Sequence, residues 1–292
     1  MISEKFNGIF TALLTPFDSN NKVNEKELEK LVKYKINMGV KGFYVGGSTA
    51  EAFFLNLNER KQIMEVVRSC AENCTLIAHI GSLNEGEAKE IGAYANKLGY
   101  DCVSSVAPFY YKFTFDEIKN YYIRLAEASG LPMLVYHFPA FSGVNMGVGE
   151  MSEFLTDDRF IGIKYTSNDY FTMEQCKTKF ANKLVYNGFD EMFLSGLSMG
   201  ADGGIGSTYN FMADKFVKMQ KLYAGNRLEE AREIQREANR IIAILCKIGV
   251  MQAEKEVLNQ LGFDFGVCRP PFGVPTDEEK ELIKREITSK LI

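Results

Sequence analysis

The sequence lacks any long apolar run. None of its hydrophobic stretches reaches the length of a membrane span or of the core of a signal peptide. We therefore expect a cytoplasmic protein that has no membrane partner.

Histidine is scarce, and cysteine does not occur in metal-binding patterns. His79 and His137 are the only two histidines, too few for a histidine-based metal cage, and we expect both to be satisfied strand residues. The six cysteines have no paired ligand spacing and no histidine cluster beside them, which is typical of reduced structural thiols. We expect neither a metal nor a cofactor.

A basic stripe is also missing. Lysine and arginine (34 residues) are scattered among 38 acidic residues, which gives a formal net charge of -4. Nucleic-acid binding normally requires basic residues gathered on one face. We therefore expect a small-molecule substrate and no nucleic-acid partner.

The sequence does contain a repeated alternation of strand-like and helix-like segments. The first strand is predicted over Phe6–Leu14, before a helix that opens at about Asn24. The further predicted strands are Gly42–Val45, Thr75–Ile80, Cys102–Val106, Pro132–Tyr136, Phe160–Thr166, Lys183–Tyr186 and Gly203–Ser207. Helices are predicted from about Asn58, Asn84 and Thr114 after the second, third and fourth of the eight strands. Each crossover is long enough for a parallel connection, so the pattern predicts an α/β fold, a (β/α)8 TIM barrel.

The domain organisation follows from the same pattern. Residues 1–225 are predicted to form the barrel that carries the active site, and residues 226–292, with apolar residues at helical spacing, a C-terminal helical extension. An open doubly wound sheet is the alternative. Its glycine fingerprint should follow the first strand, whereas the glycine-rich stretch Gly200–Gly206 lies late and lacks the dinucleotide spacing.

The predicted strand Phe160–Thr166 is unusual because it carries Lys164 near its C-terminal end. Burial disfavours the ammonium form of lysine, so such a side chain can present a free amine to a carbonyl and form a Schiff base. A strand-end lysine is more often ion-paired or extended towards solvent. The catalytic interpretation therefore depends on the other strand ends.

Those strand ends carry hydroxyls, a phenol and carboxylates. After the second strand, Gly46–Glu51 offers the hydroxyls of Ser48 and Thr49 and successive amides that could hold a carboxylate, or a tight turn that caps the next helix. Tyr136 is either a core residue or an acid/base group. Asp190 and Glu191 are either helix-dipole partners or ligands of a polyhydroxylated molecule.

Taken together, an amine, a phenol and a carboxylate-binding turn suit aldol chemistry on an α-keto acid. The amine attacks the ketone, the protonated imine accepts electrons, and a general base removes a proton from a hydroxyl two carbons away. The carbon–carbon bond then breaks.

Several long segments of the chain resemble one known family. They are Ala12–Asp18, Tyr44–Glu51, Ala107–Tyr111, Tyr136–Gly143, Gly162–Thr166, Tyr186–Glu191 and Gly200–Asn210. The sequence is similar to the N-acetylneuraminate lyase branch of the class I aldolases, the family that also contains dihydrodipicolinate synthase. The resemblance implies reversible cleavage of N-acetylneuraminate, a sialic acid, to pyruvate and N-acetyl-D-mannosamine.

The resemblance also implies roles for individual residues. Lys164 would form the Schiff base, Tyr136 would transfer protons, and Ser48 and Thr49 would bind the keto-acid carboxylate. Tyr110 matches a tyrosine that relatives lend to a neighbouring subunit, so a homotetramer is implied. The matched positions that line the sugar pocket are Thr166, Gly188, Asp190, Glu191 and Ser207.

Two departures from the family pattern are visible. Ala50 stands where relatives usually have glycine, which is costly if that turn requires a positive φ. The arginine that the synthase branch places after the tyrosine is absent from Phe138–Gly143, which favours an uncharged partner. Two alternatives stay open: a lyase or synthase acting on another 2-keto acid, and a non-catalytic sugar-acid-binding protein on the same scaffold.

Overall fold

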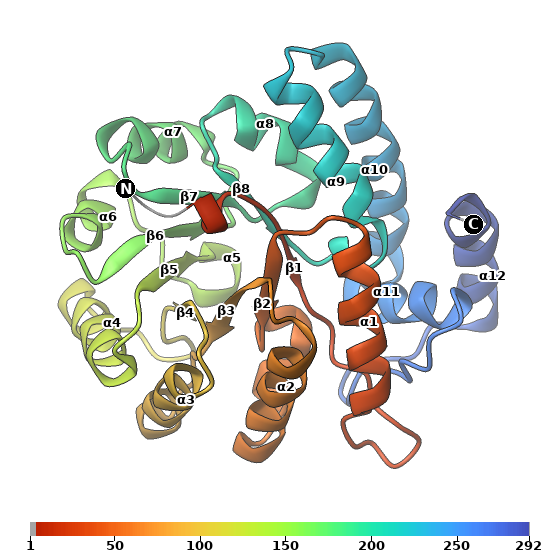
Figure 1. The fold of residues 1–292 in the computed structure, drawn as a ribbon, viewed down its shortest axis with the longest axis horizontal. Coiled ribbons are helices and arrows are strands. Elements are labelled where there is room, and N and C mark those ends of the chain that lie inside the picture. Colours follow the sequence, from red (N-terminus) through yellow and green to blue (C-terminus); the bar gives the residue numbers. More distant parts are fainter. Residues whose placement is uncertain (1–3, 292) are drawn as a thin grey trace.

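The computed structural model describes residues 4–291, and its centre is a closed parallel barrel (Figure 1). The eight strands pair in chain order, and β8 pairs with β1. The strands are β1 (Gly8–Ala12), β2 (Gly42–Val45), β3 (Thr75–His79), β4 (Cys102–Val106), β5 (Met133–His137), β6 (Phe160–Tyr165), β7 (Leu184–Asn187) and β8 (Gly203–Gly206). The predicted TIM barrel is confirmed.

Helices surround the barrel and follow its strands. They are α1 (Glu25–Asn37), α2 (Leu57–Cys70), α3 (Glu85–Lys97), α4 (Phe115–Ser129), α5 (Pro139–Ser142), α6 (Val148–Leu155), α7 (Tyr170–Lys179), α8 (Phe193–Ser198) and α9 (Tyr209–Ala224). Their starts lie close to the predicted ones because the sequence supplies N-caps. Asn56 and Thr114, for example, each form a capping box with a glutamate three residues later.

Three more helices follow the barrel: α10 (Leu228–Ile248), α11 (Val250–Gln260) and α12 (Asp277–Glu286). Figure 1 shows them on one side of the barrel, beside α1 and α9. The side of α10 that carries Ala231, Ile234, Ala238, Ile241 and Leu245 is buried, as its helical spacing predicts.

The first strand is shorter than predicted. It ends at Ala12 rather than Leu14, because the amide of Leu14 donates to the side chain of Asn210 instead of to a strand carbonyl. Strands β5 and β7 each extend one residue beyond their predicted C-terminal ends, to His137 and Asn187. These shifts leave Lys164 and Tyr136 at the same end of the barrel.

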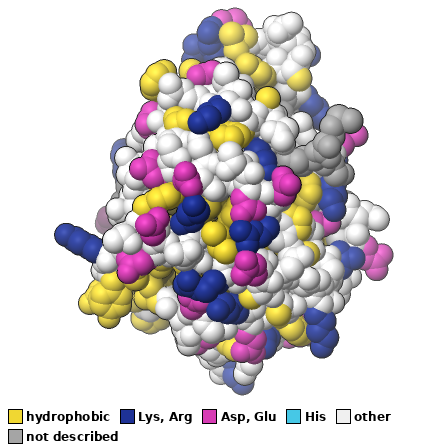
Figure 2. All heavy atoms as spheres, turned by 90° about the vertical axis from the view of Figure 1, so that its left-hand side faces the viewer, with side chains coloured by type: hydrophobic (Ala, Val, Ile, Leu, Met, Phe, Trp, Pro, Cys, Tyr) yellow, Lys and Arg dark blue, Asp and Glu magenta, His cyan; other side chains and the backbone are white. Residues whose placement is uncertain are grey.

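The core has two layers. One fills the barrel interior with side chains such as Phe10, Tyr44 and Tyr136, and the other lies between the strands and the helices. No helix within residues 4–291 is long and apolar enough to cross a membrane. On the face shown in Figure 2, basic and acidic side chains lie next to one another.

Candidate active site

The side chain of Lys164 is buried near the C-terminal end of β6, between two tyrosine rings. Its Nζ lies 3.9 Å from the ring centroid of Tyr136 and 4.3 Å from that of Tyr44. Burial lowers the pKa of Lys164 to about 7, and the carboxylate of Asp190 acts in the opposite direction. A substantial fraction of the amine is therefore uncharged at neutral pH and available as a nucleophile.

Tyr136 lies beside Lys164 on the neighbouring strand, and the two residues pair in register. Burial raises the pKa of the Tyr136 phenol, so it stays protonated in the resting protein. The hydroxyls of Thr166 and Ser48 face this phenol and act in the opposite direction, although the Thr166 hydroxyl makes no well-formed hydrogen bond within residues 4–291. The phenol is thus placed to give a proton to a group that forms at Lys164.

Ser48 and Thr49 open a short 3-10 helix, Ser48–Ala50, directly after β2. Both side chains are partly exposed, as a binding turn requires. Ala50 does not have a positive φ; the residues of the turn Gly46–Glu51 that do are Gly46, with φ 73°, and Glu51, with φ 58°. The turn thus does not require a positive φ at position 50, so Ala50 does not carry the backbone strain that alanine would have in that conformation.

Asp190 begins a 3-10 helix after β7 and is buried. Its Oδ2 accepts hydrogen bonds from the amide and the hydroxyl of Thr208, at 2.9 and 2.7 Å, while Oδ1 has no partner within residues 4–291. Burial raises the pKa of Asp190 to about 6, against the effects of Thr208 and Lys164. Gly206 makes room for this carboxylate, because a Cβ there would lie 1.8 Å from Oδ1.

Other predicted sugar-pocket residues surround the same end of the barrel. Thr166 is buried after β6, and Gly188 allows it to come close, since a Cβ on Gly188 would lie 1.9 Å from the Thr166 hydroxyl. Ser207 follows β8 and is partly exposed, as is Glu191. The structure therefore places these residues around the barrel mouth that contains Lys164.

Tyr110 is the predicted site residue that the chain does not bring into this group. Its side chain is 83% exposed in the loop between β4 and α4, and its φ is 77°. A tyrosine rarely adopts this conformation, and such strain occurs mainly at functional positions. Its ring contacts Tyr111, which is also exposed.

Sequence reasoning missed two consecutive residues of α11, Glu254 and Lys255, which are almost fully buried. The Lys255 ammonium forms an ion pair with Glu51 at 2.6 Å, and Glu254 Oε1 accepts a hydrogen bond from the Ser207 hydroxyl at 2.7 Å. The available signal was their spacing: both lie on the helix face that also buries Val257 and Leu258. Charged residues at core positions of a helix require partners.

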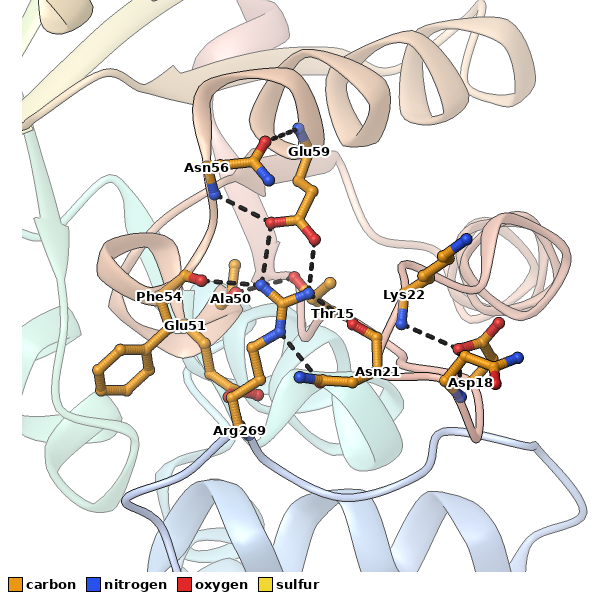
Figure 3. A network of polar contacts seen from close by, with 11 residues as sticks. Thr15, Asp18, Asn21, Lys22, Ala50, Glu51, Phe54, Asn56, Glu59 and Arg269 are labelled. Carbon is orange, nitrogen blue, oxygen red and sulfur yellow. Dashed lines mark hydrogen bonds and ion pairs between the residues drawn. The ribbon is translucent and has the colours of Figure 1, made fainter.

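The segment between α11 and α12 also holds the turn Gly46–Glu51 after β2, through Arg269 (Figure 3). The Arg269 amide donates to Glu51 Oε2 at 2.7 Å, and its guanidinium donates to the carbonyls of Phe54 and Asn21 and to the Glu59 carboxylate. Lys255 and Arg269 thus hold Glu51, three residues after Ser48, from two sides.

The two histidines differ. His79 Nδ1 lies 3.0 Å from the Gly46 carbonyl and Nε2 accepts from the Val106 amide at 3.3 Å, as expected for a satisfied strand residue. The same expectation is wrong for His137, whose buried ring packs on Tyr165 and has no hydrogen-bond partner within residues 4–291. In that part of the chain, no three His, Cys, Asp or Glu side chains are grouped so that they could hold a metal ion.

The model of the dihydrodipicolinate synthetase family matches residues 5–290. The chain belongs to this family. Among its relatives, the N-acetylneuraminate lyase of Pasteurella multocida is 41% identical over 98% of this chain and 98% of its own.

Two solved structures superpose on nearly the whole chain. CdNal from Clostridium difficile, determined in complex with mannosamine, has a TM-score of 0.95 and 37% identity over 98% of this chain and 99% of its own. The N-acetylneuraminate lyase of Fusobacterium nucleatum complexed with pyruvate has a TM-score of 0.93 and 37% identity over 99% and 98%. The fold and the family thus agree with the barrel and the resemblance expected from the sequence.

Proposed function

We propose that the protein is a Schiff-base lyase that cleaves N-acetylneuraminate reversibly to pyruvate and N-acetyl-D-mannosamine. The observation that carries this proposal is the buried amine of Lys164, which has a lowered pKa and lies beside the Tyr136 phenol at the barrel mouth. The names of the relatives support the choice of substrate class.

In the first half of the proposed mechanism, the Lys164 amine adds to the C2 ketone of the substrate and forms a carbinolamine. The protonated Tyr136 phenol gives its proton to the departing hydroxyl, which leaves as water. This leaves an iminium ion beside a tyrosine phenolate, and the two opposite charges stabilise each other in the buried site.

In the second half, the phenolate removes the proton of the C4 hydroxyl. The electrons of the C3–C4 bond move into the iminium and give an enamine, while C4 leaves as the aldehyde of N-acetyl-D-mannosamine. Protonation of C3 and hydrolysis of the imine release pyruvate and restore the free amine.

We assign the two ends of the substrate to opposite sides of the mouth. Ser48 and Thr49 hold the keto-acid carboxylate. The polyhydroxylated tail meets the residues after β6, β7 and β8, which are Thr166, Gly188, Asp190, Glu191 and Ser207. The buried carboxylate of Asp190 favours a tail without a second carboxylate, because like charges repel strongly at buried positions.

A homotetramer in the cytoplasm is part of the same proposal. Tyr110 is exposed and strained, and Tyr111 and Phe113 beside it are also exposed, which suits a surface that a second copy covers. In such an assembly Tyr110 would complete the neighbour's proton relay.

Trapping with borohydride tests the proposal. Incubation with pyruvate and borohydride should leave one stable adduct at Lys164, detected by mass spectrometry of peptides. Lys35 is a matched internal control, since burial also lowers its pKa to about 7, but it lies on α1. Modification of surface lysines alone, or no adduct, would contradict the mechanism.

The variant Tyr136→Phe tests the proton transfers of the reaction. The ring still packs while its proton-transfer group is gone, so the adduct with pyruvate should still form, but more slowly, with solvent in place of the phenol as the proton donor to the departing hydroxyl. Cleavage of N-acetylneuraminate should fall by about 10² to 10⁴. Cleavage near the wild-type rate would show that another group transfers the proton.

A further inference from the structure

Glu254 is a buried carboxyl with one oxygen satisfied and one free. Its Oε1 accepts a hydrogen bond from the Ser207 hydroxyl at 2.7 Å, and its Oε2 has no hydrogen-bond partner within residues 4–291. The next residue of α11, Lys255, pairs with Glu51 instead. Among residues 4–291, Ser207 is therefore the one hydrogen-bond partner of the Glu254 carboxyl.

The surroundings of Glu254 keep it protonated at neutral pH. Burial and the nearby carboxylate of Asp190 raise the pKa of Glu254 to about 8, against the hydrogen bond from Ser207. The other titratable groups near it are the thiols of Cys246, on α10, and Cys268, in the segment after α11, and Lys255 on its own helix.

The protonation state of Glu254 decides what Ser207 can offer to a ligand. A carboxylate can only accept, so the serine hydroxyl must donate its single proton to it and can only accept from the ligand. A carboxyl that carries its proton on Oε1 reverses this hydrogen bond over the same 2.7 Å: it donates to the serine oxygen, and the serine proton is then free to point at the ligand. Ser207 is partly exposed at the barrel mouth, where that proton would reach the tail of a substrate.

We propose that Glu254 is a positioning residue that holds Ser207 as a hydrogen-bond donor towards an oxygen of the substrate tail. This inference rests on the proposed lyase function. It adds a residue of the C-terminal helices to the part of the site that binds the polyhydroxylated end. Glu254 acts through Ser207 and does not touch the reacting carbons.

The test compares Glu254→Gln and Glu254→Leu with the wild type from pH 6 to 9. Glutamine keeps an uncharged hydrogen-bond donor at position 254. The KM of Glu254→Gln for N-acetylneuraminate should therefore match that of the wild type at pH 7. The wild-type KM should rise above about pH 8, as Glu254 ionises, and this rise should be absent in Glu254→Gln. Leucine removes the hydrogen bond and should raise KM at pH 7 by roughly 2- to 12-fold.

Two controls make the result specific. Glu256→Gln makes the same chemical change on the same helix, at a partly exposed residue whose carboxylate accepts from Gln260, and should behave as the wild type. Borohydride trapping of pyruvate should be equal in all variants, because the keto-acid end lies away from Ser207.

The outcomes separate the two proposals. If Glu254→Gln keeps the alkaline rise in KM, or if Glu254→Leu leaves KM unchanged, the role of Glu254 is wrong while the lyase function stands. If wild-type protein shows neither trapping at Lys164 nor cleavage, both proposals fall. Should Glu254→Leu not fold, the pH profile of Glu254→Gln still decides.

Discussion

Two buried lysines, Lys35 and Lys164, have pKa values lowered to about 7, and of these two Lys164 lies near the C-terminal end of a barrel strand. Lys35 is enclosed on α1, with its Nζ 3.2 Å from the Met38 sulfur and over the Tyr34 ring. Lys164 is at the C-terminal end of a barrel strand, the end at which TIM barrels bind substrates. Desolvation makes both amines nucleophilic, and Lys164 is the candidate nucleophile because of its position at that end of the barrel.

The pH dependence of trapping tests this view of Lys164. The uncharged amine is the reactive form, so the rate of trapping by pyruvate and cyanoborohydride should rise with pH, with an inflection at the pKa of Lys164, about 7. Asp190 holds the pKa of Lys164 up. In Asp190→Asn the inflection should therefore move to lower pH.

Rates measured at intervals of half a pH unit would locate both inflections. An unchanged inflection in Asp190→Asn would show that this carboxylate does not influence the amine. An inflection near pH 10 in the wild type would mean that Lys164 is solvated in solution.

The candidate residues at the strand ends could be found from the sequence, but the two on helix α11, Glu254 and Lys255, could not. Lys164 stood out because a charge interrupted an apolar run, and Tyr136 and Asp190 followed once the strands were placed. Glu254 and Lys255 were missed because their partners, Ser207 and Glu51, are far away in the chain. Only the three-dimensional packing of α11 brings them to the mouth.

At the scale of elements, helix α11 and the segment after it support the turn after β2. Lys255 and Glu51 form an ion pair with side chains 1% and 0% exposed, and the Arg269 amide binds the second oxygen of Glu51. Glu51 itself has a left-handed backbone conformation. The sequence could not show this strain, and it directed attention to Ala50 instead.

The variant Lys255→Met should lose stability and carboxylate binding together. It leaves the Glu51 carboxylate buried without its cation, which typically costs about 3–5 kcal/mol in the free energy of unfolding. The 3-10 helix that presents Ser48 and Thr49 should then be less well held, so the KM for pyruvate in the synthetic direction should rise.

The double variant Lys255→Met/Glu51→Gln is the matched control. It removes the unpaired charge, and so should recover part of the lost stability in thermal unfolding. Removal of the exposed Arg232–Glu229 ion pair should change the thermal stability little by comparison. Equal stability of Lys255→Met and wild type would show that the buried ion pair is not needed.

At the scale of the whole molecule, the closed barrel was predictable because strand-like and helix-like segments alternate eight times. The division into a barrel over residues 1–225 and an extension over residues 226–292 stays a prediction. The packing of α10 and α11 against α9, together with the contacts of Glu254 and Lys255, shows that these helices contact the barrel closely.

The proposed tetramer leads to a prediction about mass in solution. In sedimentation experiments the protein should have four times the mass of its 32.9 kDa chain. Tyr111→Glu, at an aromatic side chain 68% exposed beside Tyr110, should shift the mass towards smaller species and lower cleavage with it.

Val274→Glu is the control, since Val274 is also exposed but lies in the segment before α12. It should leave both mass and activity as in the wild type. A wild-type protein that sediments as a monomer with full activity would contradict the assignment of Tyr110 to a neighbour's site.

Glu254 and Lys255 are neighbours in the chain, yet one contacts the segment after β8 and the other the turn after β2. In the proposed binding mode, helix α11 sets the length of substrate that fits, because one rigid element supports both the turn proposed to bind the carboxylate and the serine proposed to bind the tail. Selection for shorter or longer 2-keto acids should therefore accumulate substitutions on α11 and its flanking segments, while the strand residues that perform the chemistry stay unchanged.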